Sequence, residues 1–357
     1  MRSDNSLTSR QVTALAWTAL ISPVFRQLPH AVAAEAGRGA WVSVLLSALP
    51  LLLLGLLLRG LLRRLQPGEG LGSLPGRCLG VPCGRLVRFI FALWLLLYAG
   101  FVLRAGAQRF SEAVFPGSSP GLFIVVTVLV SLPAALGAAR PLGRCAELIR
   151  PAVLSVLLLC FAFALPQVEG DNLLPVFASD RSGILRGVLP VTETLSLAAV
   201  VCFLPGASPG RSAWSSAALM LLLAALLTLT TVGQFGAALT VRISYPFFVM
   251  MRSVRLLGLL ERVEALIIVQ WVLTDFVLLG LLLQAARGEL LGAFSAGTAR
   301  RWGAAASAAA AGIAFLLGAE SSDAAVLQFR VMPSVNASML LGLLPLCCVI
   351  GRLRRKL

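Results

Sequence analysis

Ten apolar stretches, each close to the length needed to cross a bilayer, dominate this chain of 357 residues. A helix needs about 20 apolar residues to span the hydrocarbon core. With 58% hydrophobic and only 13% charged residues, the chain has more apolar residues than a soluble core requires. We therefore expect an all-α membrane protein with about ten transmembrane helices, near residues 12–33, 40–58, 87–110, 121–138, 149–166, 184–204, 214–236, 264–285, 303–318 and 335–350.

The formal net charge of +15 is carried almost wholly by arginine, since Lys356 is the only lysine. Most of the basic residues fall in the loops that lie on the same side as both termini if ten helices span the membrane. The positive-inside rule then predicts cytoplasmic N- and C-termini and an even number of spans. The same rule explains the basic charge, so we expect no nucleic-acid partner.

Two connecting segments have compositions that predict more structure than a simple loop. Residues 59–86 are basic and rich in Gly and Pro, which predicts a cytoplasmic loop with a short interfacial helix. Residues 242–263 are amphipathic, with arginines among the apolar positions, and are too charged to span. We expect this second segment at the outer surface, either as an ordinary interfacial helix or as a lid folded over the bundle.

The sixth stretch, Ile184–Leu204, is long enough to span but carries polar residues before its middle. Pro190 removes a backbone donor and disturbs a helix. Glu193, flanked by Thr192 and Thr194, places a carboxylate where it is expensive, which by default marks a function. These features predict a membrane helix that is broken around a polar site.

Ten spans divide into two sets of five, and the two sets have opposed topology because five is an odd number. We expect one repeat at about 12–166 and a second at about 184–350. Transporters built in this way place their site where discontinuous helices meet, at corresponding positions of the two repeats. A disturbed sixth span therefore predicts that the first span is disturbed as well.

The first stretch does contain such a disturbance. Ser22 and Pro23 are followed within a few residues by Arg26, Pro29 and His30. Two prolines and two titratable residues so close together are unusual in a straight helix that faces lipid. We therefore predict a break in this span and a binding site between spans 1 and 6.

Each candidate in the two spans has two interpretations. Glu193 either binds a ligand or bonds the backbone N–H groups freed by the break. Thr192 and Thr194 either line the site or bond back to their own helix. Ser22 and Pro23, with the loosened backbone around them, would offer carbonyls and amides to a small zwitterion, since half-helix ends attract opposite charges.

Several segments along the chain carry a family resemblance. They are LPHAVAAEAGRGAWVSVLLSALP (28–50), YAGFVLRAGAQRF (98–110), NLLPV (172–176), GVLP (187–190), TVGQFGAALTVRISYPFFVMMRSV (231–254) and ERVEAL (261–266). In order and spacing, this set resembles the B subunit of spore germinant receptors, the endospore germination permeases of the amino acid–polyamine–organocation superfamily. The chain departs from the family at Ile21–Val24, where a glycine-based break is usual.

The resemblance implies a LeuT-like 5+5 inverted repeat with broken helices 1 and 6. It also implies a multi-pass subunit of a germinant receptor in the inner spore membrane, acting with A- and C-type subunits. That subunit would bind a small nutrient germinant, most often an amino acid, and help to trigger germination. The alternatives are a proton- or sodium-coupled amino acid transporter, and a scaffold subunit that binds nothing.

Further candidates lie outside the two disturbed turns. Arg26 and His30 are either gating groups or snorkel toward the outer interface. Tyr98 in span 3 either caps the site with its hydroxyl or packs as an ordinary tyrosine. Arg104 matches the family pattern and would pair with Glu193 or with an acid on the outer side.

Span 8 often completes a cation site in the fold that the resemblance implies. Gln270 and Thr274 share a helix face there at i, i+4 spacing and are candidates for the ligand site. Asp275 is either an ion- or proton-linked group or a partner in a buried ion pair.

Other classes of chemistry find little support. The chain has one histidine and seven cysteines, and Cys78 and Cys83 share a loop without further ligands nearby. No phosphate-binding glycine loop or Cys/His cluster is present in the sequence. We therefore expect no enzyme activity, no cofactor, no metal site and no disulfide framework.

Overall fold

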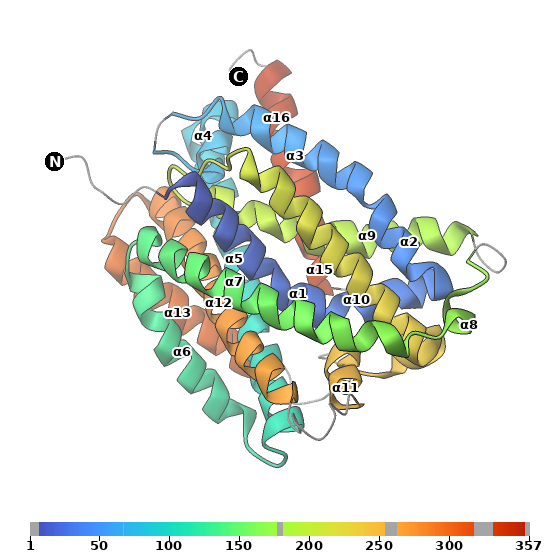
Figure 1. Ribbon diagram of the computed structural model, residues 1–357. Coiled ribbons are helices and arrows are strands. Elements are labelled where there is room, and N and C mark those ends of the chain that lie inside the picture. Colours follow the sequence, from blue (N-terminus) through green and yellow to red (C-terminus); the bar gives the residue numbers. More distant parts are fainter. Residues whose placement is uncertain (1–6, 67, 177–180, 254–262, 318–330, 354–357) are drawn as a thin grey trace.

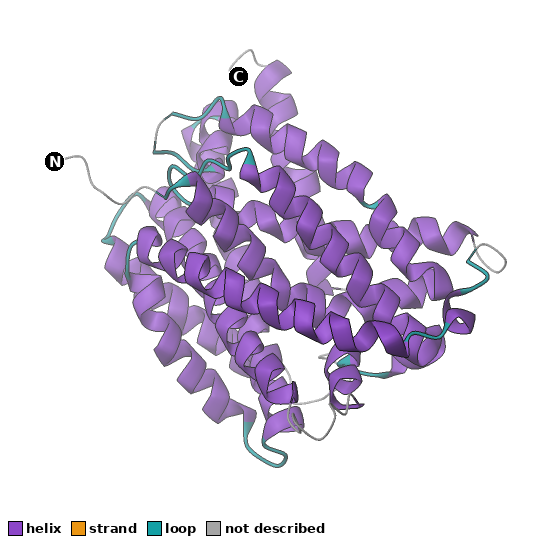
Figure 2. Ribbon diagram, viewed as in Figure 1, coloured by secondary structure: helices purple, strands orange, loops and turns teal. Residues whose placement is uncertain are grey.

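The computed structural model describes residues 7–66, 68–176, 181–253, 263–317 and 331–353. Within these ranges the chain is built from helices and loops, without strands (Figure 2). Helices suit a membrane because each satisfies its backbone hydrogen bonds internally. The first half contains α1 (Ser9–Ala36), α2 (Ala40–Leu46), α3 (Ala48–Leu62), α4 (Leu74–Leu79), α5 (Val81–Arg109), α6 (Pro120–Leu136), α7 (Ala139–Ala164) and α8 (Gly170–Leu173). The second contains α9 (Arg181–Ser196), α10 (Ser212–Arg242), α11 (Pro246–Ser253), α12 (Val263–Phe294), α13 (Ala299–Leu316), α15 (Met332–Ala337) and α16 (Leu344–Leu353).

Among the described residues, seven helical stretches are long and apolar enough to cross a membrane. They include the predicted spans except the fourth and the ninth. The fourth corresponds to α6, which is apolar but short, and the ninth to α13, which is rich in alanine and has two arginines in its first turn. The chain is therefore an all-α membrane protein, and the count of ten crossings stays a prediction.

The first of these stretches, Ser9–Leu62, is 54 residues long and covers two predicted spans. A straight helix of that length would measure about 80 Å, far more than a bilayer core of about 30 Å. The chain turns at Gly37–Gly39, where Gly37 has a φ of +55° that side chains other than glycine rarely adopt. After this turn, α2 packs back against α1 and also contacts α9 and α10.

The predicted break in span 1 is wrong, because α1 is one continuous helix from Ser9 to Ala36. Pro23 and Pro29 both lie inside it, and both are buried. Each proline removes a single N–H donor, which bends a helix more readily than it ends one. Helices α7, α9, α10 and α12 surround α1 and hold it in place (Figure 1).

Span 6 does change its backbone, but later than predicted. Helix α9 passes through Pro190 and continues to Ser196. The chain then tightens into a 3₁₀ helix over Leu197–Phe203, which is buried except at Ala198. A 3₁₀ stretch inside a membrane helix often marks a hinge or strain. The irregular backbone therefore follows Glu193 by one helical turn.

The helix packing supports two repeats related by a two-fold axis. If spans 1 to 5 are exchanged with spans 6 to 10, many contacts map onto contacts. The pair α5–α13 maps onto α12–α6, α5–α6 onto α12–α13, α1–α10 onto α9–α2, and α1–α7 onto α9–α15. Equivalent helices also touch each other directly, as α1 does α9, α5 does α12 and α6 does α13. The repeat boundaries themselves stay predictions.

The two predicted connecting segments are partly helical. Within 59–86, α3 extends to Leu62, the short α4 covers Leu74–Leu79, and α5 already begins at Val81. Leu71, Leu74 and Cys78 are buried against the bundle, and α4 packs on α5 and α16. Within 242–263, α11 packs on α10 and α12, while residues 254–262 lie outside the described part.

Candidate functional site

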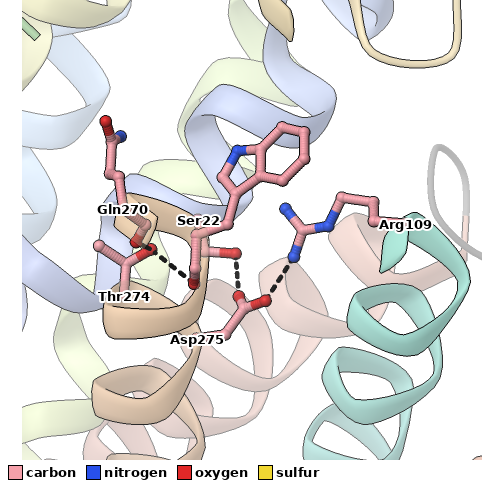
Figure 3. A network of polar contacts seen from close by, with 6 residues as sticks. Ser22, Arg109, Gln270, Thr274 and Asp275 are labelled. Atoms are coloured by element: carbon pink, nitrogen blue, oxygen red, sulfur yellow. Dashed lines mark hydrogen bonds and ion pairs between the residues drawn. The ribbon is translucent and has the colours of Figure 1, made fainter. Parts of the chain in front are cut away.

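Three helices meet at a buried ion pair in the interior of the bundle. Asp275 of α12 accepts a hydrogen bond from the Ser22 hydroxyl of α1 and forms a salt bridge with Arg109 of α5 (Figure 3). Ser22 and Arg109 are at most 1% exposed, and Asp275 is 8% exposed. Charges this deep are costly unless they are paired, so the contact ties the three helices together.

The surroundings of the pair are shaped to hold it. Gly106 of α5 lies against the carboxylate, and a Cβ there would sit 3.3 Å from Oδ2 of Asp275. On the other side, the Arg109 guanidinium lies over the Trp271 ring, 4.9 Å from its centroid. An aromatic face stabilises a desolvated cation. Arg109 is therefore balanced by one carboxylate and one ring, which is typical of a structural ion pair.

Gln270 and Thr274 share a face of α12, as predicted, but behave differently. The Thr274 hydroxyl donates to the backbone oxygens of Gln270, at 2.8 Å, and Trp271, at 3.3 Å (Figure 3). It is therefore occupied within its own helix. Gln270 is 2% exposed, and neither its amide nitrogen nor its amide oxygen has a hydrogen-bond partner. Of the two residues, Gln270 is the one whose side chain has an unused hydrogen-bond donor and an unused acceptor.

Arg26, one turn after Ser22 on α1, is the most unusual residue of the interior. It is 1% exposed, and none of its three guanidinium nitrogens has a hydrogen-bond acceptor. Its charge faces the Phe101 ring, 4.9 Å from the centroid. A fully buried guanidinium presents five donors and normally finds a carboxylate or carbonyl oxygens. The side chain of Arg26 is buried inside the bundle, so it does not extend to the outer membrane interface.

Several polar and charged groups lie around Arg26. Asp275, Arg109, Tyr98 and Tyr245 lie close enough to act on its charge. Among these, two guanidinium groups face one carboxylate, and that carboxylate is already bonded to Arg109. Arg26 therefore has no carboxylate partner of its own in the described part of the chain, in a region where charge is expensive. An anion that enters this region would gain both the charge and the free donors of Arg26.

Tyr245 lies in the turn between α10 and α11 and is one of the polar groups near Arg26. Burial and the nearby Glu112 raise the pKa of Tyr245 to about 12. The phenol therefore stays protonated at neutral pH and keeps its hydrogen-bond donor. It also packs near Trp271, with ring centroids 6.2 Å apart.

Tyr98 lies within the core of α5. It is 1% exposed and packs beside Phe101, with ring centroids 5.9 Å apart. Its hydroxyl lies near Arg26 and near Asn336 of α15. Asn336 is also buried and accepts a hydrogen bond of 2.8 Å from the Trp94 indole. The structure therefore brings Tyr98 to the neighbourhood of Arg26.

Helix α9 contributes a hydrogen bond to α1 in the interior of the bundle. The Gln27 amide nitrogen donates to the Thr194 hydroxyl at 3.3 Å, between side chains that are both at most 2% exposed. The Gln27 amide oxygen has no partner. Thr192 instead donates to the Val188 carbonyl of its own helix at 2.8 Å. Thr194 thus belongs to the interface between the two helices, whereas Thr192 is satisfied locally.

Glu193 and Pro190 stay apart from the ion pair. Glu193 is 8% exposed, and its carboxylate forms no hydrogen bond or salt bridge within the described part of the chain. Its backbone oxygen accepts the Ser196 hydroxyl at 2.8 Å, just where the 3₁₀ helix begins. Pro190 is half-buried within the continuous part of α9. No hydrogen bond or salt bridge in the described part of the chain joins the Glu193 carboxylate to Arg26 or Asp275.

Arg104 and Pro23 also lie outside the polar contacts. Arg104 is half-buried, and no salt bridge joins it to Glu193 or to any other acid that the structure describes. The partner of the buried acid is instead Arg109, five residues further along α5. Pro23 is buried inside the continuous α1. Its expected role, loosened backbone, is therefore not present.

Arg109, Gln27 and Asn336 are members of this interior that the sequence analysis did not select. All three are polar residues inside apolar stretches, and in the sequence this is the feature that makes them candidates for the interior. That signal does not say which way a side chain points, so it identifies candidates without ranking them.

The apolar helices and the buried charges together define a polytopic membrane protein. A family model described as spore germination protein matches residues 6–309, and the chain belongs to this family. No curated protein matches the sequence.

Among solved structures, the chain is similar to two point mutants of a manganese transporter from Eremococcus coleocola. Each is 14% identical, with a TM-score of 0.47, and the match covers 96% of this chain and 78% of the transporter. At this TM-score the likeness does not establish a shared fold.

Proposed function

We propose that this protein is the integral-membrane subunit of a spore germinant receptor, and that it binds a small nutrient with a carboxylate group. Amino acids are the class that fits best. The observation that carries the proposal is Arg26, a buried guanidinium without an acceptor, in a member of the spore germination protein family. A ligand carboxylate would supply the missing charge and the missing acceptors.

The ligand's ammonium group needs acceptors in the same interior. The amide oxygens of Gln27 and Gln270 are buried and accept no hydrogen bond. These oxygens are the right chemistry for an ammonium group, which has three donors and no acceptor. Tyr98 and Phe101 would form the wall beside Arg26.

Signalling would follow from differential binding. A ligand changes the balance between two arrangements of helices only by as much as its affinity differs between them. Gln27 and Thr194 join α1 to α9, and the 3₁₀ stretch begins just after Ser196, two residues further on. A ligand at Arg26 would therefore act on the α1–α9 interface. The protein would lie in the inner spore membrane with both termini in the cytoplasm. Its change of conformation would alter its contacts with the A- and C-type subunits.

Thermal stabilisation of the purified full chain by the twenty common amino acids tests the binding step. We expect at least one amino acid to raise the melting temperature, and Arg26→Gln to abolish that rise. Arg104→Gln is the matched control, because Arg104 is a half-buried arginine outside the polar contacts. Stabilisation that persists in Arg26→Gln would remove Arg26 from the site. No stabilisation by any amino acid would favour a scaffold subunit.

The second candidate is a secondary transporter of amino acids coupled to protons or sodium ions. Its support is the permease-type architecture of the chain. Proteoliposomes that contain the chain alone separate the two functions. Uptake of a labelled, stabilising amino acid would establish transport, whereas binding without uptake would favour the receptor.

A further inference from the structure

A second feature of the molecule, away from Arg26, is a cavity of about 610 Å³ between α1, α3, α10 and the 3₁₀ helix Leu197–Phe203. Pockets for small molecules usually measure about 300–1,000 Å³. The cavity lies where α3 diverges from α10 after Ser47, whereas α2 before it packs on α10. Trp214 of α10 reaches across to α3, where Gly55 leaves room for its ring.

The walls of the cavity are apolar. Helix α3 contributes leucines, α1 contributes Trp17 and Leu20, and α10 contributes Met220. On the outer surface of α3, Leu52, Leu53 and Leu56 are 46–59% exposed, as expected for side chains that face lipid. The cavity therefore lies beside the lipid-facing surface, and its interior suits a hydrocarbon chain.

The rim carries the opposite chemistry. Its charged residues are three exposed arginines, Arg59, Arg63 and Arg211, and no acidic residue lines the cavity. Arg59 and Arg63 are one turn apart, so they share a face of α3. Arg211 directly precedes the first residue of α10, and the N-terminus of a helix also favours an anion. Trp214 lies within the first turn of α10, as tryptophan does at a membrane interface.

We propose that this cavity binds an anionic phospholipid of the surrounding bilayer. One acyl chain fills the apolar interior, and the phosphodiester of the head group pairs with Arg59, Arg63 and Arg211. The charge complementarity of the rim selects the anionic head, and the apolar walls select a lipid over a soluble anion. Basic pockets between membrane helices bind anionic head groups by the same physical principle. This site is independent of the binding proposed at Arg26.

Native mass spectrometry of the detergent-purified full chain tests the proposal. The probes are palmitoyl-oleoyl phosphatidylglycerol and the zwitterionic phosphatidylcholine with the same chains. We expect preferential binding of the phosphatidylglycerol. Each arginine near a membrane surface contributes about 1 kcal/mol to the binding of an anionic lipid, which is about fivefold in affinity. The triple variant Arg59→Gln/Arg63→Gln/Arg211→Gln should therefore lose most of the preference.

The matched control is Arg144→Gln/Arg300→Gln/Arg301→Gln, which removes three exposed arginines that do not line the cavity. It should keep the preference. A second variant, Ala16→Leu/Ala198→Leu, fills the cavity from two of its walls and should weaken binding of the phosphatidylglycerol with all arginines present.

Three results would overturn the proposal. The first is equal binding of the two lipids by the unaltered chain. The second is an equal loss of preference in the rim and control variants. The third is palmitate binding in the cavity to the exclusion of phospholipid, which would identify a free fatty acid as the occupant.

Discussion

Helices α1 and α9 occupy equivalent places in the two repeats, and both contain proline, yet their polar side chains are held differently. Helix α1 is continuous and brings Ser22 to the Asp275–Arg109 pair. Helix α9 changes to a 3₁₀ helix and leaves its only acid, Glu193, without a partner in the described structure. The regular helix supplies Ser22 to the buried ion pair, whereas the irregular helix carries a buried acid that lies outside that pair.

This difference separates fixed parts from movable ones. Breaking a buried ion pair strongly destabilises a protein, so α1, α5 and α12 are expected to move as one body. Helix α9 is joined to α1 by the Gln27–Thr194 hydrogen bond and by the exposed Glu35–Arg186 salt bridge of 3.5 Å. Such contacts are worth about 1 kcal/mol or less. A change driven by ligand is therefore easier at α9.

The largest expected effect is that of Asp275→Ala. This variant leaves Arg109 buried without its carboxylate and Ser22 without its acceptor. We expect the free energy of unfolding to fall by about 3–5 kcal/mol. Reversible unfolding of the purified chain in mixed detergent–SDS micelles would measure the loss.

The control is Glu35→Gln, which breaks the exposed salt bridge between α1 and α9. It should cost at most about 1 kcal/mol. The double variant Asp275→Ala/Arg109→Met removes both charges and should recover a large part of the loss. Equal, small effects of Asp275→Ala and Glu35→Gln would contradict the view of α1 as the fixed helix.

Arg26→Met is expected to change stability in the opposite direction. The variant removes a buried charge without an acceptor and keeps an apolar side chain against Phe101. The ligand-free protein should gain about 1–3 kcal/mol. Stabilisation by amino acids should disappear in the same variant. A loss of stability instead would show that Arg26 supports the fold.

The sequence predicted the helices well because a bilayer demands about 20 apolar residues for each crossing. It also selected Ser22, Asp275 and Arg26 as candidates, with a position at the outer interface left open for Arg26. It did not identify Arg109, because the contact depends on the rotation of α5. Arg104 and Arg109 are five residues apart and thus point about 140° apart around a helix. Only the packing of α5 against α12 decides which one meets Asp275.

The predicted break in α1 failed for a related reason. Proline removes one hydrogen bond, but whether the helix ends there depends on its neighbours. Four helices pack around α1, and Pro23 and Pro29 are both buried within that packing. The cost of a proline is local and visible in the sequence, whereas the support that offsets it comes from residues far along the chain.

A loss of similar size is expected from Thr194→Val, which removes the acceptor of the Gln27 amide between α1 and α9. A buried donor without a partner costs about 1–3 kcal/mol. Thr192→Val is the matched control on the same helix, because that hydroxyl bonds only to the Val188 carbonyl. It should cost less than about 0.5 kcal/mol. Similar losses in the two variants, measured by SDS unfolding, would show that the link between the helices is unimportant.

The smallest effect on stability is expected for Glu193→Gln. The carboxylate has no hydrogen bond or salt bridge among the described residues, so Glu193→Gln removes no stabilising contact and the free energy of unfolding should not fall. A carboxylate inside a membrane helix that does not support the fold is a candidate for function. Spores that carry this variant should therefore insert the protein normally but respond to the germinant at a shifted concentration. An unchanged dose–response would show that Glu193 takes no part in the response, and would leave Thr194 as the residue of α9 that joins the interior to the irregular turn.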